Sequence, residues 1–98
     1  MKVVAVTACP TGIAHTYMAA EQLEKVGKQL GHIVKVETQG AMGIENELTA
    51  ADIKAADFVI FAVDIDVENK ERFEGRKIIQ VPVQQAIKDA KGIFGKMI

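Results

Sequence analysis

The sequence predicts an α/β domain: a three-layer sandwich in which a four-stranded parallel sheet, in the order 2-1-3-4, carries helices on both faces. Two runs of uninterrupted apolar residues, 3–6 and 58–63, are typical of strands that are buried on both sides. Between and after these runs, apolar residues recur at helical spacing. This alternation of strands with helices is the pattern of a parallel sheet that helices cover on both faces.

The first half of the chain contains one strong helical signal. Four apolar residues fall at positions 0, +4, +7 and +11, which is one face of a helix over about residues 16–30. They are Ala19, Leu23, Val26 and Leu30. Gly31 then provides a natural stop. Residues 33–37 alternate apolar and polar, as in a strand near a sheet edge, and residues 38–48 are expected to form a glycine-containing loop.

The second half continues the alternation with shorter elements. Thr49 and Asp52 resemble a capping box, which predicts a short helix. The second apolar run is the third strand, and the charged segment after it has room for one helical turn around residues 68–73. Residues 77–81 are the predicted fourth strand. After Pro82, apolar residues keep helical spacing to the end of the chain, which predicts one C-terminal helix.

The predicted strand order points to one reactive side chain. Right-handed crossovers favour the order 2-1-3-4, with the two apolar strands in the centre and the other two at the edges. In such a sheet a crevice opens at the carboxyl ends of the strands where the order reverses, here between the first and third strands. Cys9, the only cysteine of the chain, comes just after the first strand. We therefore predict that Cys9 is the reactive centre.

Composition limits the classes of function. The 98 residues suit a single domain, residues 1–98, and the 49% of hydrophobic residues can form a core. A formal net charge of −1 argues against nucleic-acid binding, which normally needs a basic excess. The longest apolar run, 58–63, is too short to span a membrane, and no signal-peptide pattern is present, so a cytoplasmic protein is expected. One cysteine and two histidines predict no internal disulfide and no metal site, and no cofactor is expected.

The loop between the first strand and the first helix has the features of a phosphate site. It consists of Cys9, Pro10, Thr11, Gly12, Ile13, Ala14, His15 and Thr16. Backbone N–H groups and a helix N-terminus favour an anion, and Gly12 lets the chain bend closely around it. The hydroxyls of Thr11 and Thr16 can donate further hydrogen bonds. The same surroundings favour a thiolate, so a phosphoryl group carried on Cys9 is the predicted chemistry.

Other interpretations of these residues stay open. A lone cysteine in a small protein is often just a buried apolar side chain. His15 could contact a phosphoryl group or simply occupy the first helical turn, and Asp64 could lie near the site or be a solvated turn residue. A Cys-based phosphatase is disfavoured, because its motif has an arginine six residues after the cysteine, where this chain has His15. The nearest arginine is Arg72.

Several other side chains are expected to have no part in the chemistry. Tyr17 and Met18 could touch a partner, but their helical spacing favours core packing. Arg72 and Arg76 are expected on a charged surface, with docking as a minor alternative, and His32 in a solvated turn.

Residues 9–20 resemble the signature of the fructose-type IIB domains of the bacterial phosphoenolpyruvate-dependent sugar phosphotransferase system. The resemblance continues through residues 36–40, 56–57, 64, 72–75 and 81–83. It implies that Cys9 accepts a phosphoryl group from a phosphohistidine of a IIA protein and passes it to fructose or a fructose-like sugar held by a membrane IIC component. The protein would then be a cytoplasmic phosphotransferase that meets the inner membrane only through IIC. A regulatory module that reports phosphorylation state is the alternative.

Overall fold

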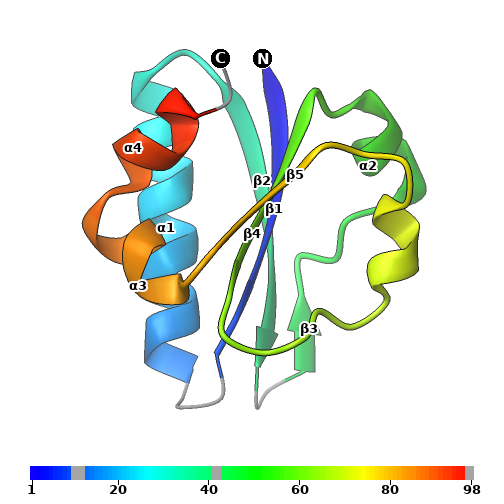
Figure 1. Ribbon diagram of the computed structural model, residues 1–98, viewed down its shortest axis with the longest axis horizontal. Helices are drawn as coiled ribbons and strands as arrows, with labels where there is room; N and C mark the ends of the chain where they lie inside the picture. The colour runs from blue at the N-terminus through cyan, green and yellow to red at the C-terminus, as the bar shows by residue number, and fades with distance from the viewer. Residues whose placement is uncertain (10–12, 41–42, 97–98) are drawn as a thin grey trace.

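Within the described residues, five strands form one sheet in the order β3-β2-β1-β4-β5 (Figure 1). The computed structural model describes residues 1–9, 13–40 and 43–96. The strands are β1 (Lys2–Ala8), β2 (Ile33–Gly40), β3 (Gly43–Glu45), β4 (Phe58–Val63) and β5 (Ile78–Val81). The helices are α1 (Ile13–Gln29), α2 (Ala50–Ala55), the 3-10 helix η1 (Lys70–Phe73), α3 (Val83–Lys88) and α4 (Ala90–Gly95).

The four strands predicted from the sequence are present in the predicted relative order. β1 is parallel to β2 on one side and to β4 on the other, and β5 is parallel to β4. The two apolar runs thus occupy the interior of the sheet, where side chains on both faces are removed from water.

The prediction of a four-stranded, wholly parallel sheet is wrong in one respect, because β3 adds an antiparallel fifth strand. β2 extends past residue 37 to Gly40, and the chain returns so that Gly40 pairs with Gly43 and Thr38 with Glu45. β3, and not β2, is therefore the edge on this side. Gly43 has a φ of +91°, a conformation that favours glycine. A strand of three residues is too short to show a period of two, so no sequence pattern predicts it.

Helices cover both faces of the sheet, as predicted. α1, α3 and α4 lie on one face, and α2 and η1 lie on the other (Figure 1). The core under α1 includes Leu23 and Phe94, and the core under α2 includes Ile53 and Phe73. Phe73 meets Phe61 edge-on, with the ring centroids 5.0 Å apart. Of the helices that the structure describes, none has both the length and the apolarity to cross a lipid bilayer.

The predicted capping box at the start of α2 is confirmed. Thr49 Oγ1 accepts a hydrogen bond from the Asp52 N–H at 3.1 Å, and Asp52 Oδ2 accepts one from the Thr49 N–H at 2.9 Å. Asp52 Oδ2 also lies 2.6 Å from Lys35 Nζ on β2. The hydrogen bond from Lys35, followed by those from Thr49, lowers the pKa of Asp52 to about 2.

The single C-terminal helix predicted from the sequence is divided into α3 and α4. Asp89 interrupts it with a φ of −146° and a ψ of 53°. Its N–H donates to the Gln85 carbonyl, and its carboxylate accepts from the Gly92 N–H at 3.1 Å. One residue therefore ends the first helix and caps the second. The apolar spacing continues across this break, which is why the pattern predicts one helix.

Candidate functional site

Cys9 follows the carboxyl end of the central strand β1, where the sequence placed it. Its side chain is only 6% exposed and belongs to the core under α1. Helix α1 begins at Ile13, so its first turn comes soon after Cys9 in the chain. The predicted loop residues outside the described part of the chain are Pro10, Thr11 and Gly12.

The first turn of α1 carries the remaining predicted site residues. Ala14 is exposed and His15 is half-buried. Thr16 is 2% exposed, and its hydroxyl has no hydrogen-bond partner within the structure, although its carbonyl accepts from Thr7 Oγ1 at 3.1 Å. Most buried polar side-chain atoms in proteins have a partner. Among the described residues, the Thr16 hydroxyl is therefore a buried donor without an acceptor.

The structure brings Asp64 to the Cys9 thiol. The Asp64 N–H donates to the Ala8 carbonyl at 3.0 Å, which continues the pairing of β4 with β1 by one residue. Cys9 Sγ donates to Asp64 Oδ2 at 3.7 Å. The other carboxylate oxygen, Oδ1, accepts from the Val83 N–H at 3.3 Å. Asp64 is thus an exposed turn residue that also lies next to the Cys9 thiol.

Tyr17 and Met18 are exposed, so the core packing expected for them is wrong. Their side chains are 39% and 48% exposed, because residues 16, 19, 20 and 23 form the buried face of α1. The Tyr17 hydroxyl donates to Glu45 Oε1 at 2.5 Å and so joins the start of α1 to β3. This hydrogen bond raises the pKa of Tyr17 above its ordinary value.

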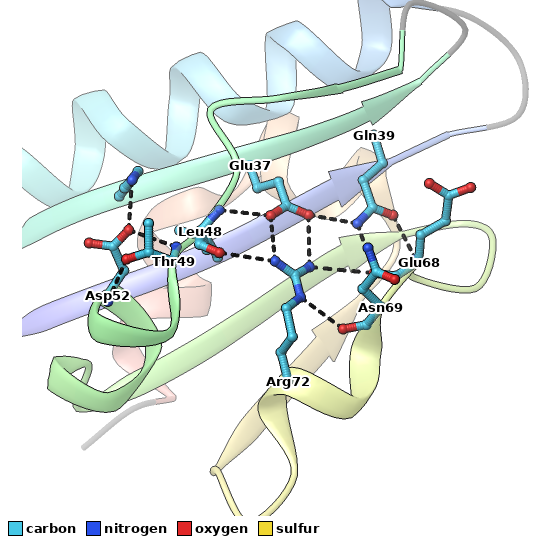
Figure 2. A network of polar contacts seen from close by, with 9 residues as sticks. Glu37, Gln39, Leu48, Thr49, Asp52, Glu68, Asn69 and Arg72 are labelled. Atoms are coloured by element: carbon cyan, nitrogen blue, oxygen red, sulfur yellow. Dashed lines mark hydrogen bonds and ion pairs between the residues drawn. The ribbon is translucent and has the colours of Figure 1, made fainter.

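A buried ion pair on the other face of the sheet was not apparent from the sequence (Figure 2). The Glu37 side chain is 0% exposed, and its carboxylate receives two hydrogen bonds from the Arg72 guanidinium, at 2.9 and 3.0 Å. The Leu48 N–H donates to the same carboxylate at 2.8 Å, and Gln39 Nε2 does so at 2.7 Å. Burial by itself would raise the pKa of Glu37, but these hydrogen bonds outweigh it and hold the pKa below its usual value.

Arg72 is therefore an internal structural residue and not the surface charge that the sequence predicted. Its guanidinium also donates to the carbonyls of Leu48, at 3.1 Å, and Asn69, at 2.8 Å. The guanidinium carbon lies 5.0 Å from the ring centroid of Phe73. Together these contacts hold both Leu48, which precedes α2, and η1 against β2 (Figure 2).

Neither of the two arginines of the chain serves Cys9. Arg72 is engaged by Glu37, and Arg76 donates to the Lys54 carbonyl at the end of α2. Both lie with the core under α2, whereas Cys9 belongs to the core under α1. The described part of this site thus has no guanidinium to clamp a phosphate group.

His32 lies at the opposite end of the sheet from Cys9 and is half-buried, not fully solvated as predicted. Its ring stacks on Phe94 with the centroids 5.5 Å apart. Its Nδ1 is 3.3 Å from the amino group of Met1.

Comparisons with known proteins agree on a IIB component of the PTS system and name different sugars. The family model for the PTS system, lactose/cellobiose specific IIB subunit, matches residues 4–96. The "PTS system fructose-like EIIB component 2" of Escherichia coli K12 is 54% identical over 96 residues, which cover 98% of this chain and 91% of that protein. The "Fructose-like PTS system EIIBC component" of the same strain is 46% identical over 99 residues, which cover 99% of this chain and 20% of that protein. A crystal structure of a domain of the fructose-specific IIABC component of Borrelia burgdorferi has a TM-score of 0.93 at 48% identity, covering 98% of this chain and 91% of that one.

Proposed function

The chain belongs to the IIB family of the sugar phosphotransferase system, and from this membership we propose that Cys9 is its phosphoryl carrier. In this proposal Cys9 accepts a phosphoryl group from a phosphohistidine of a IIA protein. It then delivers the group to a fructose-like sugar that a membrane IIC component holds. The family role in phosphoryl transfer during sugar uptake is the premise, and the identity of the residue and its partners is what we add.

The observation that carries the proposal is the position of the only cysteine. Cys9 lies where the central strand β1 ends and shortly before the first turn of α1, whose N–H groups and dipole favour an anion. The buried Thr16 hydroxyl in that turn has no partner in the part of the chain that the structure describes, and an oxygen of a phosphoryl group could accept its hydrogen bond. The residues proposed to complete the phosphate loop are 10–15.

The arginines support a carrier over a phosphatase. A Cys-based phosphatase uses a guanidinium to stabilise charge that develops as water attacks. In this chain His15 occupies the position of that arginine, and both Arg72 and Arg76 are engaged on the α2 side of the sheet. A site without this guanidinium should hold a phosphoryl group and release it slowly to water.

The relatives support the choice of partners and sugar. Relatives of 54% and 46% identity bear fructose-like names, so we propose a fructose-like substrate and not a lactose- or cellobiose-type one. One of these relatives is a IIBC component, which supports delivery to a IIC partner. The protein would then work on the cytoplasmic side of the inner membrane, bound to it only through IIC.

The proposal is tested by phosphorylating the protein with a phosphorylated IIA protein and locating the added mass by peptide mapping. We expect one phosphoryl group, on Cys9, and none on the Cys9→Ser variant, which keeps the size of the side chain but lacks the thiol. Label on His15, or label retained in Cys9→Ser, would contradict the assignment. Label on Cys9 that IIC-bearing membranes and sugar fail to discharge would favour a regulatory module instead.

A further inference from the structure

Asp64 presents a fixed carboxylate to the reactive sulfur. Its Oδ2 accepts a hydrogen bond from Cys9 Sγ at 3.7 Å, and its Oδ1 is held by the Val83 N–H at 3.3 Å. Its own N–H is bound to the Ala8 carbonyl at 3.0 Å. The backbone of Asp64 and both carboxylate oxygens are therefore engaged, so the carboxylate has a defined place next to the sulfur.

The charge of this carboxylate affects the states of Cys9 unequally. A neutral thiol can donate its proton to Asp64, as it does in this structure. A thiolate cannot donate, and a phosphorylated sulfur carries negative charge at the same place. Like charges about 4 Å apart repel one another even when water surrounds them. Asp64 is exposed and Cys9 is buried, so the carboxylate lies between the buried sulfur and water.

We propose that Asp64 sets the phosphoryl-transfer equilibrium of Cys9, because its negative charge next to the sulfur disfavours the phosphocysteine relative to the unmodified thiol. The statement on phosphocysteine rests on the function proposed above. In acceptance, the sulfur loses its proton to solvent, the S–P bond forms as the N–P bond of the donor histidine breaks, and the imidazole takes up a proton. Because Asp64 disfavours the product of this step, it favours the next one, in which the sulfur passes the group on. Asp64 acts through Cys9 and is a positioning residue.

The negative charge that Asp64 provides next to the sulfur can be measured without any phosphoryl donor. The Asp64→Asn variant keeps the shape of the side chain and an oxygen for the Val83 N–H, but removes the charge. Alkylation rates of Cys9 are compared for iodoacetamide, which is neutral, and iodoacetate, which is anionic. The ratio of the two rates cancels changes in access to the sulfur and reports the local charge. We expect the iodoacetate-to-iodoacetamide ratio to rise about five-fold in Asp64→Asn, the factor expected for one charge at about 4 Å in water.

Two further variants separate the local effect from a general one. Asp64→Glu keeps the charge and should keep the low ratio. Asp66→Asn removes the same charge from an exposed position in the same loop and should leave the ratio unchanged. An unchanged ratio in Asp64→Asn, or an equal rise in Asp66→Asn, would overturn the proposal.

The equilibrium of phosphoryl transfer from IIA to Cys9 is then measured by mass spectrometry. Each variant is mixed with phosphorylated IIA protein at the same molar ratio. We expect the equilibrium constant for transfer to Cys9 to rise about five-fold in Asp64→Asn, with no change in Asp66→Asn. A constant unchanged in Asp64→Asn would overturn the statement on phosphocysteine. If the wild-type protein accepts no phosphoryl group at all, the proposed function fails, whereas the alkylation ratios still decide whether Asp64 provides a repulsive charge next to the sulfur.

Discussion

Replacing Arg72 by Met should destabilise the fold strongly, because it leaves the fully buried Glu37 carboxylate without its cation. The change removes two charge-assisted hydrogen bonds, at 2.9 and 3.0 Å, and keeps only the donors from Leu48 and Gln39. Removal of one partner from a buried ion pair costs about 3–5 kcal/mol. The Arg72 side chain is 19% exposed, so water screens the pair in part and we expect the lower end, about 3 kcal/mol. For a domain of this size the melting temperature should fall by roughly 12–24 °C.

The assay is urea unfolding followed by circular dichroism, with Arg76→Met as the matched control. Arg76 makes one hydrogen bond to the Lys54 carbonyl, so its replacement should cost no more than about 0.5 kcal/mol. Equal effects of the two substitutions would refute the reasoning, since both remove one arginine and only one of them breaks the buried pair.

The pH dependence provides a second check on the same variant. In the wild type the pKa of Glu37 is depressed, so its contribution to stability is present above the unfolded value of about 4.3 and is lost as the pH falls through the folded value. In Arg72→Met, burial without the guanidinium should raise the pKa of Glu37 above that of the unfolded chain. Protonation then removes the buried charge, and the stability difference between variant and wild type should shrink as the pH is lowered from 6 toward 4. A difference that stays constant over this range would mean that the charge of Glu37 is not the cause.

Two further predictions concern packing and the lifetime of the phosphorylated form. Gly27→Ala should destabilise the protein by about 1–3 kcal/mol in urea unfolding, although alanine favours helices, because the added Cβ would lie 2.3 Å from Val34 Cγ2. Gly95→Ala, whose Cβ would meet nothing within 4 Å, should not destabilise it, and a similar loss in both would contradict the packing argument. Once phosphorylated on Cys9 and separated from its donor, the protein should keep the group until IIC-bearing membranes and sugar are added, as mass spectrometry can follow. His15→Arg, which introduces the arginine spacing of a phosphatase, should shorten that lifetime. Rapid hydrolysis by the wild type would contradict the carrier role and favour a phosphatase.

The sequence predicted the centre of the fold well because hydrophobic burial dominates there. Residues 3–6 of β1 and 58–63 of β4 are apolar at every position, as expected of strands that are covered on both faces. Cys9 comes just after the first of these runs, and α1 was predicted from apolar residues at helical spacing. The capping box of Thr49 and Asp52 was also predictable, since it depends on residues only three apart.

The features that the sequence did not predict depend on contacts between distant segments. Glu37 and Arg72 are 35 residues apart, and nothing local distinguishes them from solvated charges. Burial of Glu37 follows from β3, which makes β2 an interior strand, and from η1, which covers that face. Helical spacing alone predicted core packing for Tyr17 and Met18, although residues 16, 19, 20 and 23 are the buried ones.

The parallel pairing of β1 with β4 connects the core to the chemistry. Ala8 lies opposite Val63 in this pair, so the register places the residues that follow, Cys9 and Asp64, side by side. The Val83 N–H, just after β5, then holds the Asp64 carboxylate at the thiol. The contact between thiol and carboxylate is therefore built at the carboxyl ends of neighbouring strands of the core sheet. On the other side of the sheet, the pair of Glu37 and Arg72 holds β2 and η1 and leaves no arginine for the thiol. The same fold thus places the proposed nucleophile next to an opposing charge, and it holds both arginines on the other face of the sheet, away from the thiol.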